Sequence, residues 1–290
     1  AGEAQVMAYL CDDAKTFCLK KTQAITLSGA AATTSAEKPK NTPTAAVKTP
    51  RGYTEKETDF LVHDAAKAYA LAAKSDKPMI IDFFGIWCPP CNHLDAMVLR
   101  SPKFREKTSQ RFVKLKVDAD QPYAEALKNR YKVQGLPTTI FATSDGEEIF
   151  RLIGFHPLEE MIARADTAYL NRHEGYAELA ERAQGVNPEV RYKAALIALD
   201  RNEPEKALEW LSPMRKLFEE QKDPRLVEIY KAEYGIAGKK NDVKESRRVL
   251  ERWIKEFPET PDTAENYGNL GELEETAGEK SDSVTAYTQG

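Results

Sequence analysis

The sequence has no long apolar run. Its longest apolar patches, such as residues 79–81, are only as long as a strand, whereas a membrane-spanning helix needs about 18–20 consecutive apolar residues. Net charge is also small, because 42 Lys and Arg face 46 Asp and Glu, which gives −4. A balance so close to neutral offers no electrostatic reason to expect nucleic acid or an anionic membrane as a partner. The printed chain therefore predicts no membrane span and no nucleic-acid partner.

No secretory leader is visible at the start of the chain either. Ala1 onward lacks the basic segment followed by an apolar core that defines such a leader. The last predicted helix pair stops at Gly290 without the terminal cap that repeat arrays normally need for solubility. We therefore expect the printed chain to be a mature form or a fragment of a longer protein.

What the chain does contain is apolar sequence for more than one domain. It has 290 residues, of which 41% are hydrophobic and 30% charged, a composition typical of folded globular proteins. Its four cysteines form two close pairs, Cys11 with Cys18 and Cys88 with Cys91. Such pairing suits dithiol chemistry, and persistent disulfides favour an oxidising compartment outside the cytoplasm.

The composition divides the chain into four segments. Residues 1–27 contain two short alternating stretches on either side of the Cys11–Cys18 loop, which predicts a β-hairpin. Residues 28–53 are rich in Ala, Thr, Pro and Lys, which is typical of a flexible linker. Residues 54–172 alternate helix and strand patterns, and residues 175–290 show only helical patterns.

The segment 54–172 predicts an α/β layer fold, in which helices flank a central sheet. Apolar residues recur at helical spacing from Leu61 to Ala72. We expect strands over residues 79–84, 112–117, 138–143 and 148–153, with a turn at 144–146. We expect helices after the second cysteine pair to about residue 99, then over 103–110, 123–131 and 157–170.

The helical segment contains a weak internal repeat. Asn202, Asn241 and Gly278 are each followed, five positions later, by a small residue. The resulting spacing exceeds the usual 34 residues of a tetratricopeptide repeat, which these helix pairs otherwise resemble. We expect Trp210 and Trp253 to be core residues of the repeats rather than ligand platforms, and the repeats to bind a protein partner.

The strongest chemical signal is the Cys-Pro-Pro-Cys segment 88–91. An apolar strand precedes Cys88, so this cysteine should stand where a helix begins, facing unpaired N–H groups and the positive end of the helix dipole. Both favour the thiolate, which makes Cys88 the expected nucleophile. Cys91 lies one turn later on the same side, and Pro90 is tolerated in a first helical turn because its missing N–H would have no partner there.

Three other roles for these cysteines can be considered: a structural disulfide, a zinc site and a haem attachment site. Cys88 and Cys91 could form a structural disulfide or half of a zinc site, but a site using all four cysteines lacks a second close C-x2-C pair. A c-type haem is excluded because Asn92, not histidine, follows Cys91, and His93 comes one place late. We expect His93 to be a solvated helix residue. We expect no metal and no cofactor.

With this segment, the chain resembles the thioredoxin superfamily. Residues 135–139, Gly-Leu-Pro-Thr-Thr, match the second hallmark of that family, a loop with a cis-proline opposite the dithiol. The resemblance implies that Pro137 is cis, and that Asp82 is the buried carboxylate exchanging a proton with Cys91. It also implies that Lys114 is the lysine beside that carboxylate. The groove for the substrate would be formed by Trp87, Pro89, Pro90, Leu136 and Pro137.

Within the superfamily, residues 77–82 and 135–141 are most similar to the C-terminal domain of the DsbD family of thiol–disulfide reductases. The segment around Cys11 and Cys18 resembles the end of the N-terminal domain of the same family, where a cysteine pair takes electrons from the thioredoxin-like domain. The membrane domain that lies between them in that family is replaced here by the linker 28–53. Electrons would therefore come from a separate donor, either a membrane reductase or a thioredoxin-like protein.

These expectations combine into a periplasmic or otherwise extracytoplasmic bacterial protein-disulfide reductase. Cys88 and Cys91 would reduce a disulfide-containing client protein and exchange electrons with Cys11 and Cys18, although a purely structural hairpin disulfide remains the alternative for that pair. The Pro-Pro dipeptide 89–90 resembles TlpA-like reductases more than strong oxidants. Two other functions stay open: a helical-repeat binding scaffold with a structural or vestigial dithiol, and a disulfide oxidase or isomerase.

Overall fold

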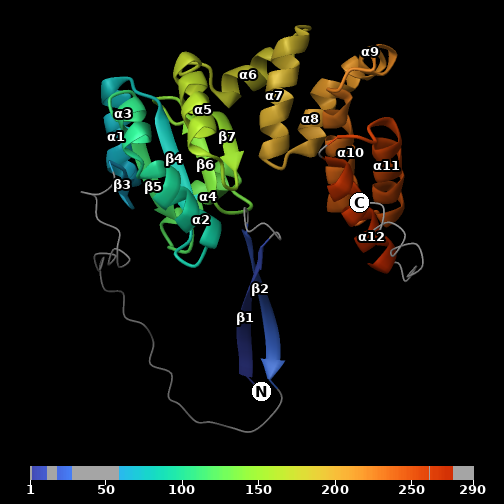
Figure 1. Cartoon of the computed structure of the whole chain (residues 1–290), viewed down its shortest axis with the longest axis horizontal. Coiled ribbons are helices and arrows are strands. Elements are labelled where there is room, and N and C mark those ends of the chain that lie inside the picture. Colours follow the sequence, from blue (N-terminus) through green and yellow to red (C-terminus); the bar gives the residue numbers. More distant parts are fainter. Residues whose placement is uncertain (1, 12–17, 28–58, 261, 277–290) are drawn as a thin grey trace. The chain divides into compact units, whose positions relative to one another are not determined.

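The computed structural model of the chain describes residues 2–11, 18–27, 59–260 and 262–276, the first two ranges as backbone only. The chain divides into two units, Ala1–Gly175 and Tyr176–Gly290, each described by itself (Figure 1). The loop between the N-terminal cysteines, the expected linker and the third predicted repeat turn lie outside the described residues. Within the described part, no helix has both the length and the apolar character that a bilayer crossing requires.

The predicted N-terminal hairpin is present. β1 (Gly2–Cys11) pairs with β2 (Cys18–Leu27) in an antiparallel ladder that runs from Gly2 opposite Leu27 to Cys11 opposite Cys18. The register thus places the two cysteine backbones directly across from each other at the loop end of the ladder.

A five-stranded mixed sheet forms the centre of the first unit. Its strand order is β3-β5-β4-β6-β7, with β3, β4 and β5 parallel and β6 and β7 antiparallel to their neighbours. β4 is buried along its whole length, which explains why its sequence is a nearly continuous apolar run, interrupted only by Asp82. The strands are β3 (Leu61–Val62), β4 (Met79–Phe84), β5 (Val113–Asp118), β6 (Thr138–Ala142) and β7 (Glu148–Ile153).

Helices cover both faces of this sheet, as the sequence pattern predicts. One face packs against α1 (Ala65–Ser75) and α4 (Ala124–Tyr131). The other packs against the helices that follow the dithiol and against the last helix of the unit. These are α2 (Pro89–Leu94), the π-helical turn η1 (Asp95–Leu99), α3 (Pro102–Thr108) and α5 (Leu158–Leu170).

The helix expected from Leu61 onward begins later than predicted. Leu61 belongs to β3, where it pairs with Leu115 of the parallel strand β5. α1 starts at Ala65 because the Asp64 side chain caps it, accepting a hydrogen bond from the Lys67 amide at 3.0 Å. Leu61 and Ala65 are four residues apart, which is a helical spacing, but Leu61 is not part of the helix. The prediction from spacing alone was wrong at this residue.

The turn predicted at residues 144–146 connects β6 to β7, and Gly146 is required in it. Its φ is +82°, and a Cβ at this position would lie 2.2 Å from the Tyr69 ring. Any side chain here would therefore meet both an unfavourable backbone conformation and a steric clash.

The second unit is a series of helices packed one after another. Its core is formed by one continuous cluster of apolar side chains, in which Trp210 and Trp253 are buried as expected. Its elements are α6 (Tyr176–Arg182), α7 (Pro188–Asp200), α8 (Pro204–Leu211), the 3-10 turn η2 (Ser212–Met214), α9 (Arg215–Gln221), α10 (Leu226–Lys239), α11 (Val243–Glu256) and α12 (Asp262–Thr276).

Two of the predicted repeat turns share one backbone geometry. Asn202 has φ +57° and Asn241 has φ +52°, values in the left-handed region that asparagine tolerates better than most residues. In both turns the following amide bonds back to a carbonyl five residues earlier, from Glu203 to Ala198 at 2.8 Å and from Asp242 at 2.9 Å. α7–α8 and α10–α11 are thus equivalent helix pairs, and the η2–α9 insertion follows the first of them.

Candidate active site

A disulfide joins Cys88 and Cys91 across the first turn of α2. Cys88 is the N-cap, and its Sγ accepts a hydrogen bond from the Cys91 amide at 3.3 Å. Pro89 and Pro90 occupy the first helical positions, where their missing N–H groups cost no helical hydrogen bond. Both cysteines are buried, with 0% exposure for Cys88 and 4% for Cys91. The sequence-predicted dithiol is therefore held in its oxidised form at a helix start.

The helix start explains the chemistry expected of Cys88. The Cys91 amide, which donates to Cys88 Sγ, and the helix dipole both favour negative charge at the N-cap sulfur. α2 runs directly into η1, so the helical path that begins at Cys88 continues to Leu99. When the disulfide is reduced, this environment favours the Cys88 thiolate, the form that attacks another disulfide.

Asp82 lies on the sheet face that α2 and η1 cover. Its side chain is 2% exposed, and Lys116 Nζ lies 3.0 Å from its Oδ2. Thr139 Oγ1 donates a weak hydrogen bond to Oδ1 at 3.5 Å. Burial raises the pKa of Asp82, and the positive charge of Lys116 opposes that shift. A carboxyl group with a raised pKa is suited to take a proton from a neighbouring thiol and to return it.

The prediction that Lys114 neighbours this carboxylate is wrong. In the parallel ladder of β4 and β5, Asp82 pairs with Lys116, whereas Lys114 pairs with Ile80. The Lys114 ammonium group instead bonds to Asp59 and to Thr108, the latter at 3.0 Å. The sequence did not show the register between the two strands, and this register decides which lysine reaches Asp82.

A second buried carboxylate, Asp95, was missed by the sequence analysis. Lys116 Nζ donates to its Oδ1 at 2.7 Å, and Arg100 Nε to its Oδ2 at 2.6 Å. Asp82, Lys116, Asp95 and Arg100 thus form a chain of charges from the buried strand β4 toward the surface. The sequence did contain a signal for Asp95. It lies four residues after Cys91, a spacing that places two residues on the same face of a helix.

Trp87 lies beside the dithiol with its indole fixed from two sides. Its Nε1 donates to Asp120 Oδ2 at 2.5 Å. Its ring lies against Gly85, where a Cβ would come within 2.9 Å of the indole. Trp87 lines a cavity of about 390 Å³ together with Leu136 and residues that flank α4. Of the five predicted groove residues, only Trp87 and Leu136 line this cavity, while Pro89 is exposed and Pro90 is buried.

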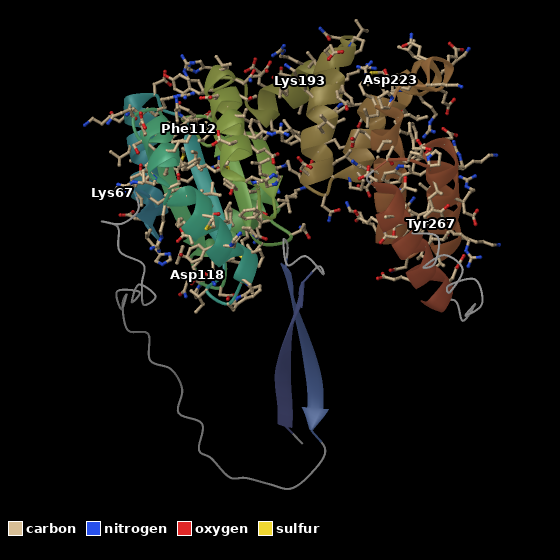
Figure 2. The ribbon with its side chains drawn as sticks, in the orientation of Figure 1. Lys67, Phe112, Asp118, Lys193, Asp223 and Tyr267 are labelled. Carbon is tan, nitrogen blue, oxygen red and sulfur yellow. A yellow bond between two sulfur atoms is a disulfide. The ribbon has the colours of Figure 1, made fainter. Side chains whose placement is uncertain are left out.

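Pro137 lies near the C-terminal end of β4, the end of the sheet at which α2 starts. Thr138, the next residue, pairs with Phe83 near the end of β4, so the strand that follows Pro137 begins where the strand before Cys88 ends. In Figure 2, the label Asp118 marks this end of the sheet, at the last residue of β5. The label Phe112 marks the opposite end, just before β5 begins. The Leu136–Pro137 peptide bond is cis.

His93 lies outside this cluster of side chains. His93 is exposed, and its ring contacts Phe155 with centroids 4.6 Å apart. Cys11 and Cys18 are described only by their backbone pairing. Among the residues whose side chains are described, no three His, Cys, Asp or Glu groups gather closely enough to hold a metal ion.

Comparisons with known proteins agree with this geometry. A family model described as a thioredoxin-like domain matches residues 65–169. Thioredoxin-1 of Drosophila melanogaster is 33% identical over 99 residues, which are 32% of this chain and 84% of the fly protein. The thiol:disulfide interchange protein DsbD of Neisseria meningitidis serogroup A is 32% identical over 99 residues, but these are 34% of this chain and only 16% of DsbD.

Two solved structures are also similar. A thioredoxin from Thermus thermophilus shares 27% identity at a TM-score of 0.37, covering 39% of this chain and 90% of that one. The oxidised DsbD C-terminal domain of Neisseria meningitidis shares 27% identity at a TM-score of 0.33, covering 37% and 98%.

The mixed sheet, the helices on both faces and the dithiol at a helix start define a thioredoxin fold. Since the family model and the fly thioredoxin match this same region, the chain belongs to the thioredoxin family. It carries in addition the N-terminal hairpin and the helical unit Tyr176–Gly290, which lie outside the matched residues.

Proposed function

We propose that the chain is a thiol–disulfide oxidoreductase that reduces disulfides in client proteins outside the cytoplasm. The observation that carries the proposal is the Cys88–Cys91 disulfide at the start of α2, in a unit that also holds the buried carboxyl group of Asp82. Two cysteine pairs in one chain suit an oxidising compartment. The chain's matched relatives are thioredoxins and thiol:disulfide interchange proteins.

The reaction begins with the reduced dithiol. The Cys88 thiolate attacks one sulfur of the client disulfide, a mixed disulfide forms, and the other client sulfur leaves as a thiolate. Asp82 then accepts the proton of the Cys91 thiol. The Cys91 thiolate attacks Cys88 Sγ and releases the second client thiolate. Two electrons have passed to the client, and the protein is left with the Cys88–Cys91 disulfide that the structure shows.

Client binding would use the loop that ends at Pro137. Leu136 and Trp87 lie on the wall of the 390 Å³ cavity, so an extended client strand can rest there beside the dithiol. Main-chain groups of the loop would hold that strand by hydrogen bonds, which accepts many client sequences because every peptide offers the same backbone groups.

The N-terminal cysteine pair would serve as a second redox centre. The backbone positions of Cys11 and Cys18 are paired at the end of the hairpin ladder, and this pair would exchange electrons with Cys88 and Cys91 when the two pairs meet. In a Cys91→Ser chain, this exchange predicts an internal mixed disulfide from Cys88 to Cys11 or Cys18. A non-reducing peptide map should detect it, and finding the Cys11–Cys18 disulfide untouched would favour a structural role for that pair.

The deciding experiment is a client trap. In Cys91→Ser, Cys88 can attack a client but nothing resolves the mixed disulfide, so covalent client complexes should accumulate on non-reducing gels. Cys88→Ser is the matched control and should trap nothing. If Cys91→Ser binds proteins only non-covalently, the helical repeats are the functional part and the chain is a binding scaffold.

The direction of electron flow needs a separate measurement. The equilibrium potential of Cys88/Cys91 can be read from Trp87 fluorescence in dithiothreitol buffers, with Cys11 and Cys18 changed to Ser. A value near about −270 mV supports the reductase, and one near about −120 mV supports an oxidase. The absence of any reversible transition would reject both.

A further inference from the structure

The segment between α4 and β6, residues 132–137, carries no regular structure and is called the proline loop below. Four of its residues, from Val133 to Leu136, line the cavity beside Trp87. α4 ends at Tyr131, and Lys132 turns the chain with φ +51°. The proline loop thus forms one wall of the cavity, and its position relative to Trp87 sets the width of that cavity.

The neighbouring strand β7 holds the proline loop at its far end. The Gly154 amide donates to the Pro137 carbonyl at 2.8 Å, directly beyond the ladder pair of Thr138 and Ile153. From the first residue of β6, Thr138 Oγ1 donates to the Gly135 carbonyl of the loop at 2.8 Å. These bonds fix the last residues of the loop relative to the sheet.

The same strand holds the beginning of the loop through one side chain. Arg151 donates from Nη2 to the Tyr131 carbonyl at 2.5 Å and from Nη1 to the Lys132 carbonyl at 3.5 Å. The last carbonyls of a helix have no partner within the helix. Arg151 therefore supplies from β7 the donors that the end of α4 needs.

Glu148 fixes the orientation of this guanidinium group. Its Oε1 accepts from Arg151 Nε and its Oε2 from Nη2, both at 2.6 Å. The side chains of both residues are 1% exposed. A buried ion pair is often no more stabilising than apolar residues of similar volume, so stability alone does not account for one here. Two fixed, directed donors at the start of the proline loop are what an apolar pair could not provide.

We propose that Arg151, oriented by Glu148, is a positioning residue that holds the proline loop in place for client binding. The inference rests on the proposed function, because it assigns the loop to the client. Arg151 acts on the loop and not on the dithiol, which α2 carries. Its loss should therefore weaken client binding while the reaction of Cys88–Cys91 with a small thiol is unchanged.

The test compares Arg151→Met, Arg151→Lys and the double variant Glu148→Leu/Arg151→Met. The double variant removes both charges, so neither stays buried without a partner. We therefore expect it to fold even if Arg151→Met alone does not. Lys114→Met is the matched control, since it removes a buried cation from another ion pair, with the partly exposed Asp59, that does not contact the loop.

The expected readout is a split between KM and kcat. For insulin reduction driven by dithiothreitol, the double variant should raise KM about tenfold with kcat within about twofold. Arg151→Lys, which keeps one donor group near Glu148, should raise KM about threefold. Reduction of the Cys88–Cys91 disulfide by dithiothreitol alone should be unchanged in every variant. A KM rise no larger than that of Lys114→Met overturns the proposal.

Amide hydrogen exchange separates this inference from the proposed function. The amides of residues 133–136 should exchange about tenfold faster in the double variant than in Lys114→Met, whether or not the wild type reduces insulin. An inactive wild type with that exchange difference would reject the reductase and keep the positioning role. Equal exchange in the double variant and the control would reject the positioning role itself.

Discussion

Lys114 and Lys116 stand two residues apart on β5 and face the same side of the sheet, yet they belong to different regions. Both side chains are 1% exposed. Lys116 joins two carboxylates, Asp82 and Asp95, at the end of the sheet where the dithiol helix starts. Lys114 lies about 6.6 Å further from that end and pairs with Asp59.

The difference shows that burial and ion pairing do not by themselves mark a functional residue. Structural ion pairs perturb pKa values as active sites do, and burial lowers the pKa of Lys114 while Asp59 opposes the change. What separates the two regions is position along the strand. Of the two lysines, only Lys116 pairs with a residue of the helical path that begins at Cys88, namely Asp95 of η1.

The largest expected difference concerns proton transfer. Asp82→Asn cannot accept the Cys91 proton, so at pH 7 the resolution of a mixed disulfide should slow about 100-fold. Stopped-flow measurement of client release from a preformed mixed disulfide reads this step. Asp59→Asn is the matched control in the Lys114 region and should leave the rate within about twofold. Equal slowing in both variants would remove the distinction.

Both lysine substitutions should lower the stability, but only one should change the rate. Lys116→Met leaves Asp82 buried without its cation, which costs about 3–5 kcal/mol. Lys114→Met should cost less, because the Asp59 side chain is 21% exposed and has Arg105 at 4.0 Å. Urea unfolding measures both losses. Only Lys116→Met should also change the rate of mixed-disulfide resolution per folded molecule, because it alone contacts Asp82. A rate loss in Lys114→Met would contradict the assignment.

The pH dependence of stability should have opposite signs in the two regions. Since the pKa of Asp82 is raised, the folded protein keeps a proton that the unfolded chain has lost. The free energy of unfolding therefore falls as the pH rises from the ordinary aspartate range through the raised value. The lowered pKa of Lys114 has the reverse effect, because there the unfolded chain binds the extra proton. Stability should rise as the pH climbs from that lowered value toward the ordinary lysine range.

Urea unfolding between pH 4 and pH 10 checks both signs. Asp82→Asn should abolish the fall and Lys114→Met the rise, each by about 1.4 kcal/mol for every unit by which the pKa is shifted. Slopes that survive these substitutions would mean that other groups carry the pH dependence.

The smallest effect should come from Asp95. Its negative charge raises the pKa of Asp82, so Asp95→Asn should lower that pKa and move the acid limb of the resolution rate down by about one pH unit. A pH–rate profile measures the shift. Glu159→Gln, which breaks an exposed pair with Lys103, is the control and should leave the profile in place. A profile unchanged in Asp95→Asn would mean that the charge of Asp95 does not set the pKa of Asp82.

The order of helices and strands was predictable from the sequence, apart from short elements. β4 and β7 have the predicted bounds, and α5 begins one residue after the predicted start. β3 was missed because two residues are too few to show a period of two. The repeat turns at Asn202 and Asn241 were found because asparagine marks left-handed turns.

Some active-site residues could be predicted from the sequence and others could not. Cys88 and Cys91 are only three positions apart in the sequence, and a helix start follows from the strand before them and the prolines between them. The role of Lys116, by contrast, depends on strand register, and that of Arg151 on contacts between β7 and the end of α4. The sequence carried no local signal for either, since a lysine on a buried strand looks the same at position 114 or 116.

The sequence was sufficient to predict the class of fold and the dithiol at Cys88 and Cys91, because periodicity, helix capping and short spacings act between residues close in the chain. The buried carboxyl group of Asp82 was an expectation from the resemblance to the thioredoxin superfamily. Only the tertiary structure decided which lysine pairs with Asp82, that Asp95 joins the same charge network, and that Arg151 reaches the proline loop. Such contacts join residues far apart in the chain, and their geometry exists only once the sheet and its helices have packed.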